Sequence, residues 1–203
     1  MSDPMRTRRG PYAKSAERRQ QIVEQAYRAF ATRGYHGSSL REIAAASGIS
    51  LSNLQHHFAT KEELLVTVLT RRDEQGHGAV SGRQGLPFRE HVLAQAAANE
   101  GVPGLIALYS ILSAEAVTQE HPGHAYFAER YEALREEYEA EFSTLRAQGR
   151  LRPGVEPALA ATTVIALWEG VQLQWLYAPD RVDAGAALRA YLDLVIVPQA
   201  DAL

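Results

Sequence analysis

The side chains best suited to recognition chemistry lie in one short run of the sequence. This run carries hydroxyl, amide and imidazole groups around one leucine: Ser50, Leu51, Ser52, Asn53, Gln55, His56 and His57. Amides and hydroxyls offer donors and acceptors together, as the edges of nucleic-acid bases require. Two nearby cations, Arg41 and Lys61, suit phosphate oxygens. The pattern favours non-covalent recognition of a polar partner such as DNA.

Histidines raise the alternative of a metal site. His56 and His57 are adjacent, so on a helix their side chains point about 100° apart. His121 and His124 flank a Pro-Gly break, and no His-Glu-x-x-His pattern accompanies them. The chain has no cysteine, and no phosphate loop, nucleophile elbow or carboxylate pair stands out. The sequence therefore predicts no metal site, no cofactor and no catalytic residues.

Two short helices joined by a tight turn must position the polar run. Ser39 can cap the first helix, and Glu42 three residues later completes a capping box. Gly48 supplies the left-handed residue that ends this helix, and Ser50 caps the second. With Leu54 facing inward, the polar side chains face out. This is the pattern of a helix-turn-helix, whose second helix lies in the major groove of DNA.

The same stretch resembles the signature of TetR-family transcriptional regulators. The matching positions are an alanine and a glycine flanking the turn, a leucine in the recognition helix, an aromatic after it and a lysine opening the next helix: Ala44, Gly48, Leu54, Phe58 and Lys61. The family usually has Thr-Leu-Tyr where this chain has Asn53, Leu54 and Gln55. That tyrosine commonly contacts a phosphate, so Gln55 either contacts phosphate or reads a base.

The expected DNA contacts divide into two groups. Leu51, Ser52 and Asn53 are expected to face bases, Leu51 through thymine methyl groups. Three basic side chains are expected to hold phosphates: Arg41, His57 and Lys61. Lys61 lies in the first turn of a helix, where a cation is unfavourable unless an anion binds there. The alternative for Lys61 is an ordinary exposed lysine.

Charge is unevenly distributed along the chain. Residues 1–75 contain 12 Lys and Arg against 8 Asp and Glu, whereas residues 76–203 contain 9 against 16. A sequence pI near 6.2 therefore hides a basic front on an acidic body. DNA binding needs local positive charge rather than a basic protein. The distribution argues against the alternative of a helical bundle whose polar residues are merely solvated.

Composition and apolar spacing predict an all-α fold with four segments. Residues 1–14 are a flexible basic arm, which either reaches the minor groove and phosphates or is a solvated tail. Residues 15–75 form the helix-turn-helix DNA-binding domain, with a supporting helix over 15–33 and a connecting helix from Lys61. Residues 76–87 are a glycine-rich flexible connection. Residues 88–203 form a helical effector-binding and dimerisation domain.

Helices are expected in this second domain over residues 88–100, 103–119, 124–148, 157–178 and from Asp183 to before Pro198, giving about nine helices in all. The stretch 158–178 is long enough for a membrane span, but Glu169 at its centre is costly in lipid. A helix covered by protein explains it better. No membrane segment, disulfide or secretory signal is expected, which suits the cytoplasm.

The resemblance also implies a ligand and a partner subunit. Regulators of this family usually enclose an effector pocket between their middle helices, and the candidates here are aromatic or polar: Tyr109, Glu115, Tyr131, Trp168, Gln172 and Trp175. The alternative is that these aromatic residues are core. The last two helices are expected to pair with those of a second copy. A dimer would read two half-sites about 34–36 Å apart.

The sequence thus indicates a homodimeric transcriptional regulator, with a repressor released from a palindromic operator by a small organic effector as the first hypothesis. Two alternatives remain. One is a regulator of the same fold without an effector. The other is a helical small-molecule-binding protein or enzyme.

Overall fold

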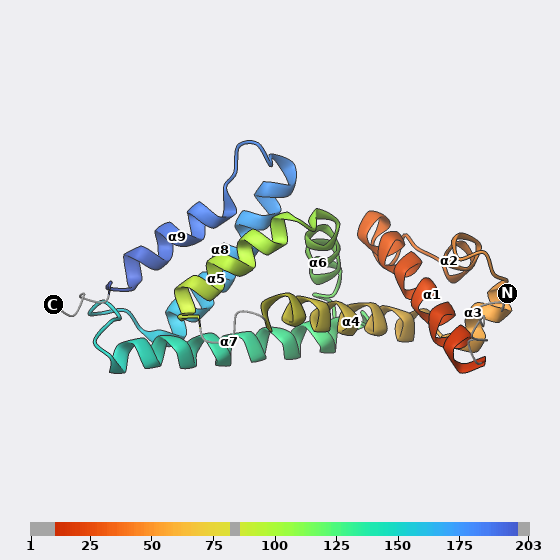
Figure 1. Ribbon diagram of the computed structural model, residues 1–203, viewed down its shortest axis with the longest axis horizontal. Helices are drawn as coiled ribbons and strands as arrows, with labels where there is room; N and C mark the ends of the chain where they lie inside the picture. Colours follow the sequence, from red (N-terminus) through yellow and green to blue (C-terminus); the bar gives the residue numbers. More distant parts are fainter. Residues whose placement is uncertain (1–10, 82–85, 199–203) are drawn as a thin grey trace, which may run out of the picture.

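The computed structural model describes the backbone of residues 11–81 and 86–198 and the side chains of 13–71 and 86–198. Within these ranges the chain forms nine helices: α1 (Pro11–Arg33), α2 (Leu40–Ala46), α3 (Leu51–His57), α4 (Lys61–Ser81), α5 (Phe88–Glu100), α6 (Pro103–Glu115), α7 (His124–Ala147), α8 (Pro157–Tyr177) and α9 (Ala184–Val195). The predicted all-α fold is confirmed. The molecule is elongated, with α1–α3 at one end, α9 at the other, and α4 and α7 lying lengthwise (Figure 1).

Three helix boundaries differ from the sequence prediction. α1 begins at Pro11, so residues 11–14 of the predicted arm are helical, while residues 1–10 lie outside the described part. α4 continues to Ser81, so residues 76–81 of the predicted connection are helical as well. Glycine costs a helix about 1 kcal/mol but does not forbid it. α6 ends at Glu115, where the His124 ring contacts the Ala116 carbonyl oxygen at 2.8 Å.

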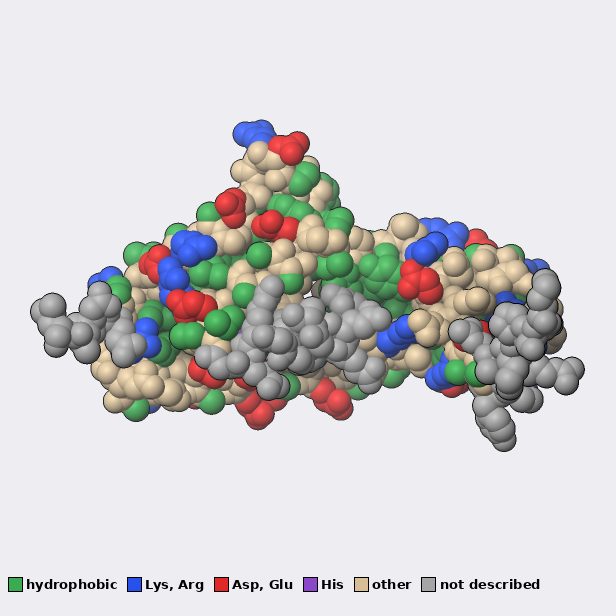
Figure 2. Space-filling model, viewed as in Figure 1, with side chains coloured by type: hydrophobic (Ala, Val, Ile, Leu, Met, Phe, Trp, Pro, Cys, Tyr) green, Lys and Arg blue, Asp and Glu red, His purple; other side chains and the backbone are tan. Residues whose placement is uncertain are grey.

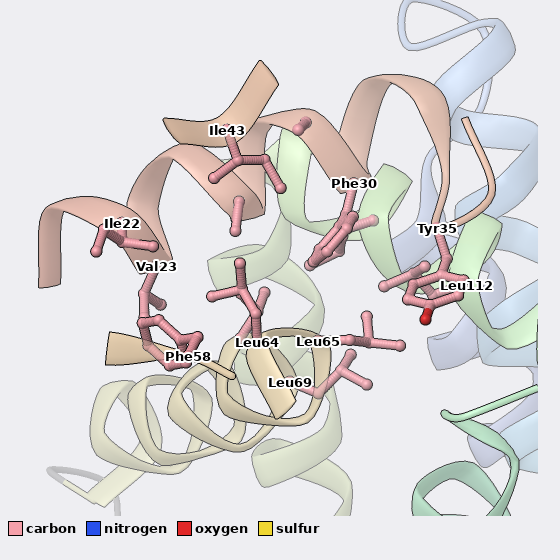
Figure 3. Close-up of a cluster of buried hydrophobic side chains, with 14 of the residues drawn as sticks. Ile22, Val23, Phe30, Tyr35, Ile43, Phe58, Leu64, Leu65, Leu69 and Leu112 are labelled. Carbon is pink, nitrogen blue, oxygen red and sulfur yellow. The ribbon is translucent and has the colours of Figure 1, made fainter. Parts of the chain in front are cut away.

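Two clusters of buried side chains hold the fold together. The first joins α1–α4 to α6, and Figure 3 shows Phe58 and Leu64 facing α1, with Tyr35 beside Leu112 of α6. The second joins α5, α7, α8 and α9 around Phe142 and Leu188, which are fully buried. The helix α6, which the sequence assigned to the effector domain, therefore completes the core of the DNA-binding helices.

The outer surface is uneven in charge and hydropathy. Acidic side chains gather along the edge formed by α7 (Figure 2). Large apolar side chains are exposed on α8 and α9: Leu159 (67%), Leu173 (46%), Tyr177 (86%) and Leu194 (68%). In the part of the chain that the structure describes, no helix has the length and hydropathy of a membrane span. The side of α8 that was expected to be covered is thus open in a single copy.

Candidate nucleic-acid interface

Local hydrogen bonds fix the start of α2. The Ser39 hydroxyl accepts from the Glu42 N–H at 3.3 Å, and the Glu42 carboxylate accepts from the Ser39 N–H at 3.1 Å. The pKa of the Glu42 carboxyl is lowered, first by the hydrogen bond from the Ser39 hydroxyl and to a lesser extent by the nearby Arg33 guanidinium. The predicted capping box is confirmed.

The turn after α2 aims the next helix. Gly48 has a φ of +67°, in the left-handed region that favours glycine, and the Ile49 N–H donates to the Ala44 carbonyl at 3.0 Å. The Ser50 hydroxyl then accepts from the Asn53 N–H at 3.2 Å and caps α3. The hydroxyl of Ser52 lies 3.0 Å from that of Ser50. The role of Ser50 shown here is to start α3, and any DNA contact by Ser50 stays a prediction.

The side chains of α3 separate by burial as the pattern predicted. Leu54 and the following Phe58 are fully buried. Four polar side chains of α3 are exposed: Ser52, Asn53, Gln55 and His56. Leu51 and His57 are half-buried, and Arg41 of α2 is exposed. The outer side of α3 therefore presents hydroxyl, amide and imidazole groups on a rigid support.

Two arginines of α1 brace this unit, a role that the sequence analysis missed. An Arg19 guanidinium nitrogen donates to the His57 carbonyl oxygen at 3.0 Å, and the group lies 4.0 Å from the centre of the Phe58 ring. Arg18 reaches the Ser47 carbonyl oxygen at 3.5 Å. The adjacent basic residues within the predicted supporting helix were the available signal. Arg18 therefore holds the carboxyl end of α2, and Arg19 holds that of α3.

The half-buried ring of His57 differs from a simple cation. Burial lowers its pKa, and the positive charges of His56, Arg19 and Arg18 lower it further. At neutral pH the imidazole is therefore more suited to hydrogen bonding than to charge pairing with phosphate. The rings of His56 and His57 lie 5.8 Å apart. Among the described residues, no group of three or more histidines and carboxylates could hold a metal ion.

The ammonium group of Lys61 has partners within the protein. Its ammonium group donates to the Ser38 carbonyl oxygen at 2.7 Å and lies 4.0 Å from the centre of the Tyr35 ring. Burial lowers the pKa of Lys61, although Glu62 and other carboxylates oppose this effect. A carbonyl oxygen and a ring thus stabilise this cation in the first turn of α4, and its contact with a phosphate stays a prediction. In this structure Lys61 fastens the segment between α1 and α2.

Glu115 lies at this same segment. Its carboxylate accepts from the Tyr35 N–H at 2.7 Å, across 80 residues of sequence. The Tyr35 hydroxyl donates to Glu62 at 2.7 Å, and burial together with this bond raises the Tyr35 pKa. Glu115 therefore joins α6 to the DNA-binding helices, and its role as an effector contact stays a prediction.

The other effector candidates are divided between the two cores. The hydroxyl of Tyr109 lies 3.0 Å from that of Tyr126. The Tyr131 hydroxyl donates to the Glu169 carboxylate. Burial, and to a lesser extent this hydrogen bond, raises the pKa of Tyr131 to about 12. Trp175 packs against the first core.

Trp168 packs against the second core, and Gln172 is half-buried on the same helix. Two open hollows on the surfaces of α1 and α4 include none of the six candidates among their lining residues. Neither hollow brings these six side chains together. Their role as effector contacts stays a prediction.

Comparison with known families agrees with this geometry. The family model described as "Bacterial regulatory proteins, tetR family" matches residues 22–68, from α1 into α4. The model described as "BetI-type transcriptional repressor, C-terminal" matches residues 89–196, more than half of the chain. The two matches together include all of the exposed side of α3 and both of the last two helices.

Individual relatives are similar over short stretches of the chain. The regulator PksA of Bacillus subtilis is 47% identical over 49 residues, 24% of each chain. The repressor Rv1474c of Mycobacterium tuberculosis is 39% identical over 71 residues, 35% of this chain and 37% of that one. The chain thus matches about a quarter to a third of the length of these relatives. A solved regulator of Saccharomonospora viridis in complex with choline shares the fold, with a TM-score of 0.73, 20% identity and coverage of 90% and 100%.

Proposed function

Because the chain belongs to the tetR family of bacterial regulatory proteins, we propose that it binds a palindromic operator as a homodimer and represses transcription from it. The exposed polar side of α3 is the observation that carries this proposal. A capping box, a left-handed glycine and a second cap hold α3, so its outer side chains face a partner in a fixed orientation. Hydroxyl and amide groups on a short helix can read base edges in the major groove.

The exposed apolar sides of α8 and α9 support dimerisation. Leu173 and Tyr177 on α8 and Leu194 on α9 are exposed in one copy. A Cβ placed on Gly170 of α8 would meet nothing within 4 Å, so a second helix can approach there. Large apolar side chains exposed on neighbouring helices favour association with a matching surface. One copy of α3 contacts few bases, whereas two copies can read both halves of a palindrome.

Release by a small organic effector is the second part of the proposal. A regulator that shares this fold is solved in complex with choline, which makes choline a reasonable first compound to test. The aromatic side chains of α6–α8, including Tyr109, Tyr131 and Trp175, could contact an organic molecule if these helices moved apart. The alternative is a regulator of the same fold that responds only to its own concentration. Its operator would be chromosomal, so a cytoplasmic location is expected in either case.

Selection of bound sites from random double-stranded DNA tests the first part. The expected result is a palindrome whose half-sites lie about one helical turn apart. A matched control is the Asn53→Ala, Gln55→Ala double variant, which changes only exposed side chains of α3. It should remain folded and enrich no site. A folded wild-type dimer that enriches no sequence would contradict the proposal and favour a binding protein or enzyme.

Thermal shifts and operator release against choline and a panel of metabolites test the second part. A compound that both raises the melting temperature and releases the operator would support an effector. Sequence-specific binding that no compound in the panel affects would favour the effector-independent regulator.

A further inference from the structure

The end of α6 meets the DNA-binding helices through one carboxylate. Glu115 is the last residue of α6, and its carboxylate accepts from the backbone N–H of Tyr35 at 2.7 Å. Tyr35 directly follows Gly34, where α1 turns toward α2 with a φ of +68°. The position of this turn sets where α2 and α3 begin. A change in the position of α6 would therefore act on the recognition helix through this contact.

The carboxylate is packed closely against the turn. A Cβ built on Gly34 would lie 2.4 Å from a carboxylate oxygen of Glu115, closer than a Cβ approaches an atom to which it is not bonded, so the carboxylate would have to move. Gly149, at the end of α7, has nearly the same φ, +69°, yet a Cβ there would meet nothing within 4 Å. Glycine at position 34 thus satisfies both a left-handed backbone and the space that Glu115 occupies.

Other groups hold the same turn from the neighbouring elements. Lys61 of α4 lies on the Tyr35 ring and donates to the Ser38 carbonyl oxygen. The buried ring of His121, between α6 and α7, lies 4.9 Å from the Tyr35 ring at an angle of 73°. These contacts restrain the Tyr35 side chain, whereas Glu115 restrains its backbone. The turn is thereby fixed to α4 and to α6 at once.

We propose that Glu115 is a positioning residue that sets the orientation of α2 and α3 on the rest of the molecule and transmits movement of α6 to them. This inference rests on the proposed function as a dimeric DNA-binding regulator. A hydrogen bond from a backbone N–H to a carboxylate is strong and directional. Tyr109, an effector candidate, also lies on α6. A ligand that shifted α6 would move the carboxylate that holds the turn.

The first test separates positioning from DNA contact. A dimer must fit two half-sites at a fixed separation, whereas binding to a duplex with one half-site does not depend on that separation. Glu115→Ala should lower affinity for the palindrome about tenfold, within the usual range of coupling between sites, and leave affinity for the single half-site unchanged. It should also broaden the half-site spacings that are selected from random DNA. Glu115→Gln keeps an oxygen acceptor and should restore most of the affinity.

The two left-handed glycines provide a matched second test. Gly34→Ala and Gly149→Ala impose the same backbone strain, but only the first displaces Glu115. Gly34→Ala should therefore reproduce the broadened spacing, and Gly149→Ala should not. In the Glu115→Ala background the clash is absent, so adding Gly34→Ala should change spacing preference little further. Thermal unfolding of each variant separates loss of fold from loss of orientation.

The outcomes are distinct for each hypothesis. Equal loss of affinity for the palindrome and for the half-site, or no change in spacing preference with either variant, would overturn the role of Glu115. Should Glu115→Ala fail to fold, the comparison of Glu115→Gln with the two glycine variants still decides the question. Failure of the proposed function would be seen earlier, as the absence of any selected site for the wild-type protein.

Discussion

The two ends of the molecule expose opposite kinds of side chain. At one end, α3 exposes amide, hydroxyl and imidazole groups above a fully buried Leu54. At the other end, α8 and α9 expose Leu159 and Leu194. Polar groups on a rigid helix suit a partner that must be read in detail, whereas apolar groups suit a surface that is simply covered. The difference indicates that the two ends serve different partners, DNA and a second copy.

The largest expected effect comes from placing charged side chains on the exposed apolar sides of α8 and α9. The double variant Leu173→Glu, Leu194→Glu should be monomeric, because four buried carboxylates would oppose the pairing of α8 and α9. Operator affinity should fall about 100-fold or more, as two linked binding events become one. Analytical ultracentrifugation and operator titration measure both effects. As a control, Val117→Glu changes an exposed apolar side chain beside α6 and should leave the dimer intact. A double variant that stays dimeric would refute the assigned interface.

The next largest effect distinguishes basic residues that contact DNA from basic residues that stabilise the fold around α3. Lys61→Met should lower the free energy of unfolding by about 1.5–3 kcal/mol, because a charged hydrogen bond to Ser38 is lost. The salt dependence of DNA binding should not change. Arg41→Ala, on the exposed side of α2, should do the reverse and reduce the salt slope by about one charge. Chemical denaturation and salt titrations distinguish the two, and a reduced salt slope for Lys61→Met would return Lys61 to the phosphate contacts.

The polar end itself is tested by its amides. Asn53→Ala should relax preference at one base position by about 1–3 kcal/mol, because a bidentate contact is lost. Binding to operators that carry each single-base change measures this preference. If Gln55 reads a base, Gln55→Ala should change the preference at one base position. If Gln55 contacts phosphate, the variant should lower affinity for all sequences alike. Uniform loss with Asn53→Ala would contradict its assignment to a base.

The smallest expected effect is on the pH dependence of stability, through the buried ring of His121. Burial lowers the pKa of His121, and His36 and Lys61 lower it further, against the opposing charge of Glu115. The folded state therefore prefers the neutral ring, so its contribution to stability is complete above the ordinary pKa of about 6.5. That contribution is lost as pH falls through the folded-state pKa. Unfolding measured from pH 8 to 5 should show a smaller decline in stability for His121→Gln than for the wild type. An identical decline in the two proteins would exclude His121 as its source.

The sequence predicted what depends on neighbouring residues. Ser39, Gly48 and Ser50 act within a few residues of themselves, so the caps and the turn could be read directly from their order. The bond from Tyr35 to Glu115 joins positions 80 residues apart, and no local pattern predicts it. The position of Lys61 likewise depends on how α4 packs against the segment after α1. The sequence did not predict that Glu115 joins α6 to the segment after α1, because residue type alone cannot distinguish a pocket from a contact between elements.

The packing of α6 limits how this protein can be divided. The core formed by α1–α4 is filled by three leucines of α6: Leu105, Leu108 and Leu112. In the sequence, α5 separates α6 from those four helices. A fragment cut after α4 would present that core to water, and the remainder would carry an orphaned apolar helix. Exchange of sensing modules between such regulators therefore has to preserve the surface of α6 that faces α1, even where every other part of the sensor is replaced.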